Sequence, residues 1–469
     1  MFDVVVIGAG PAGVNAAIDA HDQGLSVLLI DEGRDAGGQV WRPKSASIIK
    51  APVTPTEQKG EHLRERLRKS NIKRKFETRV WHIEKCGDDG WIIGLSGPDD
   101  EKQVRSKAVI IATGAQERVI PVNGWTLPGV LGLAGTTALM KENHLPPHGR
   151  SIVAGTGPLV FYVASEILRL GGTVTAILTL NSKLDWFKEL PTMILKPQLL
   201  FQGLNWVLSL YLKRIPIYWR TGIKTVEGDN AVEGATITKV DKNWAPKQGH
   251  EKYIPCESVC YGQGLMPEIS ATRLTGANHH YDEKLGGWVP TIDELGRTSE
   301  KGIYACGDNA GILGVTVAPI SGKRAARAVI EDLKGENSGA KQSNLRMMQK
   351  FGRAMTALSI SRSGLIKFID DKTEICRCEG ITKSDIDHEI THGAQSHNAV
   401  KSGTRCGMGP CGGRFCMDTV AMLTEYHTGK TREVIGLPTA RPPLRPVILD
   451  TLSDDLDYDD LPIPGVSPL

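Results

Sequence analysis

Short apolar runs on either side of a helical segment open the chain. Residues 4–7 are all apolar and have the length of a buried strand, residues 12–21 have helical character, and residues 26–30 form a second apolar run. This order of strand, helix and strand is typical of a parallel βαβ unit. We therefore predict such a unit at the start of the chain.

A second copy of this pattern begins at residue 152. An apolar run, a glycine-containing turn, a helical segment and another apolar run follow one another at 152–154, 155–158, 162–170 and 174–178. Further segments predict helices at 61–69 and 325–333, and strands at 76–83, 109–111 and 303–305. Two βαβ units predict an α/β fold with two Rossmann-like, dinucleotide-binding domains.

The chain beyond residue 335 has a different character. Polar and glycine residues at 335–344 predict a linker. Five of the nine cysteines then lie within residues 376–416, and this clustering indicates a metal centre rather than disulfides. A proline-rich stretch at 441–446 precedes an acidic run at 450–460, and we expect this tail to lie extended on a surface.

Length and charge narrow the class of protein. A chain of 469 residues is too long for a single core, so two or three domains are expected. Its 56 basic and 53 acidic residues give a formal net charge of +3, and this near-balance indicates no nucleic-acid partner.

The most apolar later stretch, residues 193–211, does not predict a membrane span. It is interrupted by Lys196, Pro197, Gln198, Gln202 and Asn205. A bilayer span takes ~20 predominantly apolar residues, so we expect a buried or interface helix pair and no integral membrane protein. No secretory signal opens the sequence, and with nine cysteines this predicts a cytoplasmic protein.

The turn after the first predicted strand carries a phosphate-binding fingerprint. Gly8-Ala9-Gly10-Pro11-Ala12-Gly13 fits G-x-G-x-x-G between a strand and a helix, and Asp31 closes the next strand. The glycines permit a tight turn and close approach to a pyrophosphate, the helix N-terminus offers free N–H groups, and Asp31 can accept a hydrogen bond from a ribose. A bare glycine turn is the alternative, but strand, helix and acid together predict nucleotide binding.

The second copy departs from this fingerprint. Val160 stands where the third glycine would be, and residues 179–181 provide neither an acid for a ribose hydroxyl nor an arginine for a 2′-phosphate. We therefore do not expect NAD(P) there, and an architectural domain or one that holds a different nucleotide is favoured.

Four of the clustered cysteines have the spacing of an iron-sulfur site. Cys376 and Cys378 form C-x-C, and Cys411 and Cys416 form C-x-x-x-x-C. Four thiolates can complete a 2Fe-2S cluster, whereas structural zinc usually takes pairs of the form C-x(2 to 4)-C. Glycines at 407, 409, 412 and 413 leave room for N–H groups to point at sulfur.

The other cysteines and the histidines are not assigned to metal. Cys406 is a fifth thiol near the predicted ligands, for which packing is favoured over exchange with a ligand. Cys256, Cys260 and Cys306 are expected to be structural thiols. No C-x-x-C lies in the first 335 residues, so a redox disulfide of the thioredoxin-reductase type is excluded, and the twelve histidines show no repeated ligand spacing.

Nearly the whole chain resembles a family: the large flavin and iron-sulfur subunit of hydrogen cyanide synthase, opine oxidases and D-hydroxyproline and proline dehydrogenases. The resemblance rests on the fingerprint, on Gly37-Gly38-Gln39-Val40-Trp41-Arg42, on Ala112-Thr113-Gly114 and on Cys306-Gly307-Asp308. It rests also on Cys-Arg-Cys-Glu from Cys376, on Gly-Met-Gly-Pro-Cys-Gly-Gly-Arg-Phe-Cys, which ends at Cys416, and on the Arg-Pro-Pro-Leu-Arg-Pro tail. The cysteine module is similar to bacterioferritin-associated ferredoxin.

The resemblance implies FAD in the first domain. The positions that it assigns to FAD are Gly8, Gly10, Pro11, Ala12, Gly13, Asp31, Glu32, Gly38, Gln39, Arg42, Val80, Ala112, Thr113, Gly114, Gly307 and Asp308. The same relatives hold Asp308 beside the ribityl and pyrophosphate part of the flavin. No catalytic residue for substrate oxidation is assigned to this chain.

The resemblance also implies partners. An amine or amino acid (an opine, hydroxyproline, proline or glycine) is expected to be oxidised on a smaller FAD-dependent subunit, and this chain to pass the electrons on. A further small ferredoxin-like subunit, FMN between subunits and a quinone acceptor at the inner face of the membrane belong to the same expectation. The rivals are a stand-alone NAD(P)H-dependent reductase and a structural or redox-sensing subunit without turnover.

These observations together predict the domain boundaries. An FAD-binding domain takes residues 1–118 and returns at 286–335, and a second dinucleotide-type domain takes 119–285. A linker and helix follow at 336–370, then a 2Fe-2S domain at 371–430 and an extended tail at 431–469.

Overall fold

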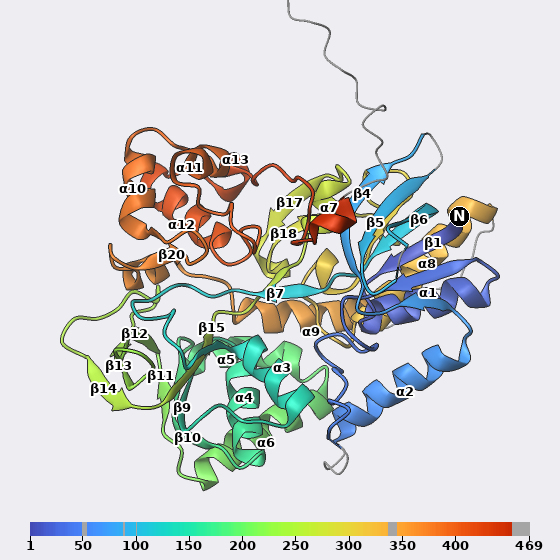
Figure 1. The fold of residues 1–469 in the computed structure, drawn as a ribbon. Helices are drawn as coiled ribbons and strands as arrows, with labels where there is room; N and C mark the ends of the chain where they lie inside the picture. The colour runs from blue at the N-terminus through green and yellow to red at the C-terminus, as the bar shows by residue number, and fades with distance from the viewer. Residues whose placement is uncertain (49–53, 88–89, 100, 336–344, 453–469) are drawn as a thin grey trace, which may run out of the picture.

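The computed structural model describes residues 1–469 except 49–53, 88–89, 100, 336–344 and 453–469. The predicted linker from residue 336 and the acidic end of the tail from residue 453 lie outside the described residues. Two helix-covered sheets form the body of the molecule, and a mostly helical domain near the C-terminus packs beside them (Figure 1). The predicted α/β class with a small C-terminal helical domain is confirmed.

The first sheet has the strand order β3-β2-β1-β6-β5-β4, and β19 pairs with β6 outside this path. Strands β1, β2, β3, β6 and β19 run parallel, whereas β4 and β5 are antiparallel additions. The strand bounds are β1 Phe2–Ile7, β2 Val27–Ile30, β3 Lys73–Lys75, β4 Arg79–Lys85, β5 Trp91–Ser96, β6 Gln103–Ile111 and β19 Ile303–Ala305. Because β19 lies far along the chain, the first domain is completed only after the second has been traversed.

Small residues bring two helices together on one face of this sheet. Helix α1 (Pro11–Asp22) packs against α8 (Ala318–Lys334), and a Cβ at Gly322 would collide with the backbone of Ala12. Alanines dominate the core at this contact. The charged helix α2 (Pro55–Lys69) lies outside, with Leu63 and Leu67 turned inward.

The second sheet has the order β11-β10-β9-β15-β8 and is entirely parallel. Its strands are β8 Val130–Gly132, β9 Arg150–Gly155, β10 Thr173–Thr179, β11 Ile217–Trp219 and β15 Ser258–Gly262. Its helices are α3 Leu133–Asn143, α4 Leu159–Arg169, α5 Lys183–Met193 and α6 Pro197–Leu212. A separate antiparallel sheet is formed by β12 Thr221–Glu227, β13 Gly234–Lys239 and β14 Lys252–Pro255.

An antiparallel strand pair joins the two domains. Strand β7 (Ala115–Glu117), on the way out of the first domain, pairs with β16 (Leu265–Pro267), on the way back. Short elements follow: α7 Ser270–Leu274, β17 His279–Asp282, η1 Glu283–Leu285, β18 Gly287–Pro290, η2 Gly307–Ala310, α9 Leu345–Ala357 and η3 Ser363–Phe368.

The C-terminal domain packs on the second domain. It contains β20 Glu374–Cys376, β21 Ile381–Thr382, α10 Lys383–Thr391, α11 His397–Thr404, α12 Met417–Thr428 and α13 Arg432–Ile435. Trp125 donates its indole N–H to the Glu374 carbonyl at 2.8 Å, and the two domains share one apolar core. The tail then crosses to the first sheet, where Leu444 donates to the Trp81 carbonyl, and α14 (Leu449–Leu452) follows.

Several boundaries differ from prediction for local reasons. The strand predicted at 76–83 is interrupted because Glu77 has a φ of +54°, so β3 and β4 are separate. Helix α2 begins earlier than predicted because Thr54 caps its N-terminus and forms a capping box with Glu57 in the first turn. Helix α8 begins at Ala318 rather than 325.

The stretch predicted to form a helix pair, residues 193–211, contains one helix, α6, because α5 already ends at Met193. Burial was one of its two alternatives, and it is wrong for most side chains, since only Met193 and Leu210 of these helices are buried. In the described part of the chain, none of the helices is long and apolar enough to cross a membrane.

Candidate functional site

The first candidate site lies at the carboxyl edge of the first sheet. The loops after β1, β2, β6 and β19 leave adjacent parallel strands in the same direction, so they meet at this edge. They contain the fingerprint, residues 31–39, residues 112–114 and residues 307–308. Ligands of open α/β sheets bind in such a crevice.

The fingerprint turn leaves a gap of the right kind for a pyrophosphate. Gly8 has a φ of +105°, and a side chain there would collide with the Ala112 carbonyl. A Cβ at Gly10 would meet nothing closer than the Gly38 Cα at 4.0 Å. Helix α1 starts directly behind Gly10, which provides no side-chain cap, so its first N–H groups face this gap.

Asp31 is held by the fingerprint itself. Its carboxylate accepts hydrogen bonds from Ala9 N–H at 2.5 Å and Gly33 N–H at 2.7 Å. Burial raises the pKa of Asp31, and these two N–H groups counteract the shift. The neighbouring Glu32 is exposed, and its carboxylate lies 3.7 Å from Arg445 in the tail. Asp31 therefore fixes the turn, while Glu32 is the more exposed of the two carboxylates.

The loop after β2 completes one wall. Gly37 donates to the Ala9 carbonyl at 2.9 Å, which places Gly38 against Gly10. Arg42 donates to Gln39 at 2.9 Å and to Glu142 of α3 at 2.6 Å. These contacts orient Gln39 and Arg42 at the boundary with the second domain.

Val80 lies farther along the same edge. It is a half-buried residue of β4, two positions after Thr78, which donates its N–H to the Asp31 carbonyl. The structure therefore places Val80 near the end of β2 rather than beside the glycine gap.

The opposite wall contains two residues that the sequence did not reveal. Asn309 is fully buried and donates to the Thr113 hydroxyl at 3.2 Å and to the Glu268 carbonyl at 2.6 Å. Its Oδ1 is buried without a hydrogen-bond partner in the described part of the chain. Asn309 could have been recognised as a site residue from the sequence, because it directly follows the Gly307-Asp308 motif. No sequence motif marks Glu268 as one.

Asp308 lies in the same wall but is already bonded. Its carboxylate accepts N–H groups from Leu313 at 3.2 Å and from Gly314 at 3.0 Å, and burial raises its pKa. The glycine gap and the free helix N-terminus fit the pyrophosphate of a dinucleotide, and the unpaired Asn309 oxygen can accept a hydrogen bond from an N–H or hydroxyl group of the same ligand.

The corresponding turn of the second domain is covered by the chain itself. Asn181 accepts the Gly157 N–H at 3.0 Å and donates to the Leu358 carbonyl at 2.8 Å. Ser359 bonds to Thr156 at 3.1 Å, and a Cβ on Gly157 would meet its hydroxyl at 2.9 Å. The segment after α9 thus occupies the space over this turn where a pyrophosphate would lie.

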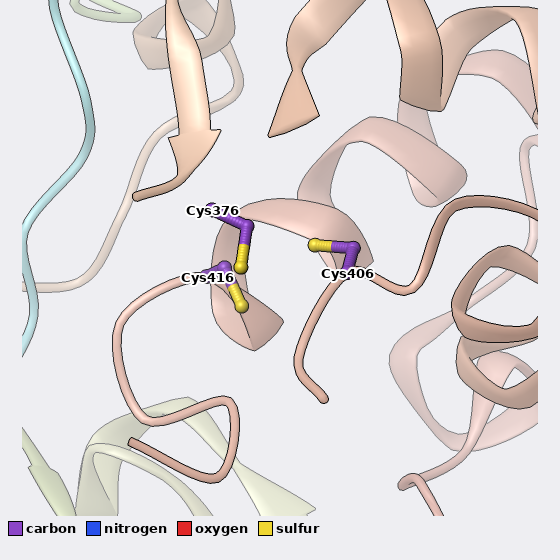
Figure 2. Close-up of side chains that lie close together, drawn as sticks. All are labelled: Cys376, Cys406 and Cys416. Atoms are coloured by element: carbon purple, nitrogen blue, oxygen red, sulfur yellow. The ribbon is translucent and has the colours of Figure 1, made fainter. Parts of the chain in front are cut away.

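The second candidate site is a group of thiols in the C-terminal domain. Cys376 ends β20, Cys406 follows α11, and Cys416 precedes α12; their sulfur atoms lie within 4.8 Å of one another (Figure 2). Cys378 and Cys411 form a second pair nearby, in which Cys378 accepts the Cys411 N–H. The four predicted ligands are thus divided between two groups, and Cys406 joins the inner one.

The surroundings of the three inner thiols stabilise one negative charge, on Cys376. Hydrogen bonds from Cys406 and Cys416, with backbone N–H groups of Gly407 and Glu379, lower the pKa of Cys376 to about 2 despite burial. The same contacts raise the pKa of Cys406 to about 12, and they raise that of Cys416 as well. An environment that stabilises a buried thiolate suits thiolate ligation of iron or zinc.

Glycines make the thiol loop possible. A Cβ at Gly409 would collide with the Cβ of Cys378, so no larger residue fits there. Gly413 has a φ of +80°, and a side chain there would press on Met417. The predicted role of these glycines beside the thiols is consistent with this close approach.

One arginine connects the two candidate sites. Arg414, within the thiol loop, donates to the Cys411 carbonyl at 2.6 Å and to the Glu268 carboxylate at 3.1 Å. The carbonyl of Glu268 accepts hydrogen bonds from Thr113 and Asn309 in the first site. A hydrogen-bonded chain of four residues therefore runs from the glycine-lined crevice to the thiols.

A buried ion triad fastens the C-terminal domain to the body. Asp418 of α12 lies 2.9 Å from Arg118 and 3.2 Å from Arg432. Burial alone would raise the pKa of Asp418, but the two guanidinium groups outweigh it and lower the pKa below its ordinary value of 3.8.

We expect Asp418→Asn to lower the free energy of unfolding by about 3 kcal/mol, because it leaves two buried arginines without this carboxylate. Stability from a carboxyl with a lowered pKa is present above pH 3.8 and is lost as the pH falls through the lower folded-state value. The variant should therefore lose less stability than the parent on acidification below pH 4. Thermal unfolding followed at several pH values measures both effects.

Glu425→Gln is the matched control, since Glu425 contacts the same Arg432 but is 46% exposed. We expect a loss of under about 1 kcal/mol there. Equal losses in the two variants would contradict the assignment of Asp418 as the residue that fastens the domain.

Known protein families match both parts of the chain. A profile of the pyridine nucleotide-disulphide oxidoreductase family matches residues 2–328, and one of the BFD-like 2Fe-2S binding domain matches residues 374–425. An opine oxidase subunit from Agrobacterium tumefaciens is 32% identical over 96% of this chain and 91% of its own. Hydrogen cyanide synthase subunit HcnB of Pseudomonas aeruginosa is 28% identical over 94% of this chain and 96% of its own.

Solved structures share the fold. L-proline dehydrogenase from P. horikoshii superposes with a TM-score of 0.73 at 23% identity, over 97% of this chain and 79% of that chain. Thioredoxin reductase from T. acidophilum superposes with a TM-score of 0.53 at 22% identity, over 71% of this chain and 98% of its own.

Proposed function

The chain belongs to the pyridine nucleotide-disulphide oxidoreductase family and groups with the opine oxidase subunit named above, and from this we propose that it is the FAD and 2Fe-2S electron-transfer subunit of a multi-subunit amino-acid or amine dehydrogenase. The observation that carries the proposal is the connection through Glu268. Its backbone contacts the dinucleotide crevice, and its side chain holds the arginine of the thiol loop. Two candidate redox sites joined by a short chain of hydrogen bonds suit an electron carrier.

When bound, FAD and a 2Fe-2S cluster convert a two-electron oxidation into one-electron steps. In this proposal the gap between Gly10 and Gly38 admits the pyrophosphate of FAD, and the N–H groups of α1 bind it. Thr113 and Asn309 hold the facing loop. Cys376, Cys378, Cys411 and Cys416 provide the thiolates for the cluster, and Cys406 remains a packed neighbour.

The electrons are proposed to come from another subunit rather than from NAD(P)H. Leu358 and Ser359 lie over the glycine turn of the second domain, and Val160 replaces its third glycine. Both features support a second domain that does not bind NAD(P). A smaller FAD-dependent subunit then oxidises the CH–NH or CH–NH2 donor. A small ferredoxin-like subunit is a further partner, FMN lies between subunits, and a quinone is the acceptor.

Anaerobic reduction tests the electron source. We expect the purified chain to remain oxidised when NADH or NADPH is added, and the complex isolated through a tag on this chain to be reduced by an opine, proline, hydroxyproline or glycine. Visible absorption follows flavin and cluster together. Rapid reduction of the isolated chain by NADH or NADPH would replace this proposal with a stand-alone reductase.

Replacing Arg414 with methionine tests the connection between the sites. The change removes the hydrogen bonds to Cys411 and Glu268, and bonds of this charged kind contribute about 1.5–3 kcal/mol each. We expect FAD and iron contents to stay at parent levels and transfer from flavin to cluster to slow, as measured by stopped-flow absorption.

Arg405→Met is the control for this variant. Arg405 also lies beside the thiols, but it pairs with Glu379 and its side chain is 69% exposed. An equal slowing in both variants would show that loss of positive charge, and not the connection to Glu268, limits the transfer.

A further inference from the structure

The helical hairpin α5–α6 presents an apolar outer surface to solvent. Nine of the nineteen large apolar side chains that are exposed in the described part of the chain lie between residues 184 and 212. They are Leu184, Phe187, Ile194, Leu195, Phe201, Leu204, Leu208, Tyr211 and Leu212. Together they form what we call the hairpin surface. Such a concentration on a folded protein marks a binding surface.

Helix α6 is apolar on both of its faces. Its inner face is anchored on α4, where Trp206 packs against Tyr162 with ring centroids 5.2 Å apart and Leu210 is fully buried. Its outer face presents Phe201, Leu204 and Leu208 at helical spacing, with exposures between 54% and 63%. No charged residue occurs in its sequence. A surface helix normally turns a charged face outward, so this face requires a cover.

Basic side chains surround the hairpin surface. Lys183 and Lys188 on α5 and Lys213 and Arg214 after α6 are exposed, and Lys196 stands between the helices. Within residues 183–214 there are five basic and two acidic residues. One of the acids, Asp185, is directed inward to the Ser182 cap and to Arg362. The charged side chains around the hairpin surface are therefore mainly basic.

The apolar side chains and the basic residues around them together indicate what covers the hairpin surface. Apolar side chains on a short helix with flanking lysines match the boundary between headgroups and acyl chains of a bilayer with anionic lipids. A second copy would bring the same positive rim against itself, and protein interfaces are depleted in lysine. With 16 residues, α6 is too short and too polar at its ends to span the bilayer.

We propose that the hairpin α5–α6 seats this protein on the surface of a membrane that contains anionic lipids, with Phe201, Leu204 and Leu208 in the acyl boundary and the flanking lysines at the phosphates. Figure 1 places α6 at the lower edge of the molecule, on the opposite side from the C-terminal domain. The seat itself is independent of the redox chemistry. Its role, which is to bring the subunit to a lipid-soluble electron acceptor, rests on the proposed function.

Co-sedimentation of the full-length chain with vesicles tests the seat. We expect binding to vesicles of phosphatidylcholine with phosphatidylglycerol, weaker binding to phosphatidylcholine alone, and release by salt. Leu204→Gln with Leu208→Gln should lower the partition coefficient by about tenfold or more, because two apolar side chains leave the acyl boundary. Lys213→Glu with Arg214→Glu should lower it on anionic vesicles only.

Val434→Gln is the matched control, since Val434 is 63% exposed on α13 and lies outside the hairpin surface. It should leave vesicle binding unchanged. Binding that is absent in the parent, or equal in the parent and the Leu204/Leu208 variant, would overturn the seat. The alternative is that a second copy of the chain binds the hairpin surface, and sedimentation velocity without vesicles tests it. A dimer of the parent that the Leu204/Leu208 variant dissociates would assign the surface to a second copy instead.

The same variants separate this inference from the proposed function. FAD content, iron content and reduction of the isolated complex by its amino acid should be unaffected by the Leu204/Leu208 change. If the amino acid does not reduce the parent complex while vesicle binding persists, the proposed electron-transfer function is wrong. The proposal that the hairpin α5–α6 binds the membrane surface is then still supported.

Discussion

Replacing Cys411 with serine is expected to abolish the 2Fe-2S cluster and leave FAD bound. Cys411 is one of the outer pair of thiols with Cys378, and it lies in the C-terminal domain, apart from the glycine-lined crevice of the first sheet. A cluster that needs four thiolates loses its fourth ligand. Iron per chain should fall from two to near zero while the flavin absorption persists, as measured by iron analysis and visible spectroscopy.

Cys406→Ser is the matched control. Cys406 lies within 4.8 Å of two of the proposed ligands, but it is outside the C-x-C and C-x-x-x-x-C pairs. We expect this variant to retain its iron, because serine fills nearly the same buried space. If Cys406→Ser lost its iron and Cys411→Ser kept it, Cys406 rather than Cys411 would be the fourth ligand.

Replacing Gly10 with valine is expected to yield folded protein without FAD. A Cβ at Gly10 has 4.0 Å of space to Gly38, so the first atom of the side chain fits. The two methyl groups beyond it fill the gap through which a pyrophosphate reaches the N–H groups of α1. Flavin released by heat and quantified by fluorescence should fall at least about tenfold.

Gly171→Ala serves as its control, because Gly171 lies in the second domain, between α4 and β10, and a Cβ there meets no atom within 4 Å. A φ of +83° at this position makes a modest loss of stability the expected result, with flavin still bound. Full flavin occupancy in Gly10→Val would show that the fingerprint does not contact the cofactor.

Local sequence predicted the parts of the sites that lie within one turn or one loop. The fingerprint could be recognised because strand, glycine turn, helix and Asp31 all fall within residues 4–31. The position of Asp31 was predicted, but its hydrogen bonds to Ala9 and Gly33 were not, because they depend on how the turn folds back on β2. The cluster thiols were likewise visible as short spacings.

Contacts between segments that lie far apart along the chain could not be predicted from the sequence. Glu268 lies 155 positions from Thr113 and 146 from Arg414, so no spacing could reveal that it joins the two sites. Packing was favoured for Cys406 over exchange with a ligand, and the sequence could not show that the fold brings its sulfur within 4.8 Å of those of Cys376 and Cys416. The sequence left open whether the apolar stretch at residues 193–211 is buried or forms an interface, because hydropathy alone does not tell a buried apolar helix from an exposed one.

The central claim is that electrons pass within this chain from FAD to the 2Fe-2S cluster. The most direct measurement is rapid-freeze electron paramagnetic resonance of the complex isolated through this chain, after anaerobic mixing with its amino acid or amine. We expect the signal of the reduced cluster to rise as the flavin is reduced and within the turnover time, and to be missing from Cys411→Ser although its flavin is reduced. Flavin reduction in the parent without a cluster signal during turnover would contradict the account.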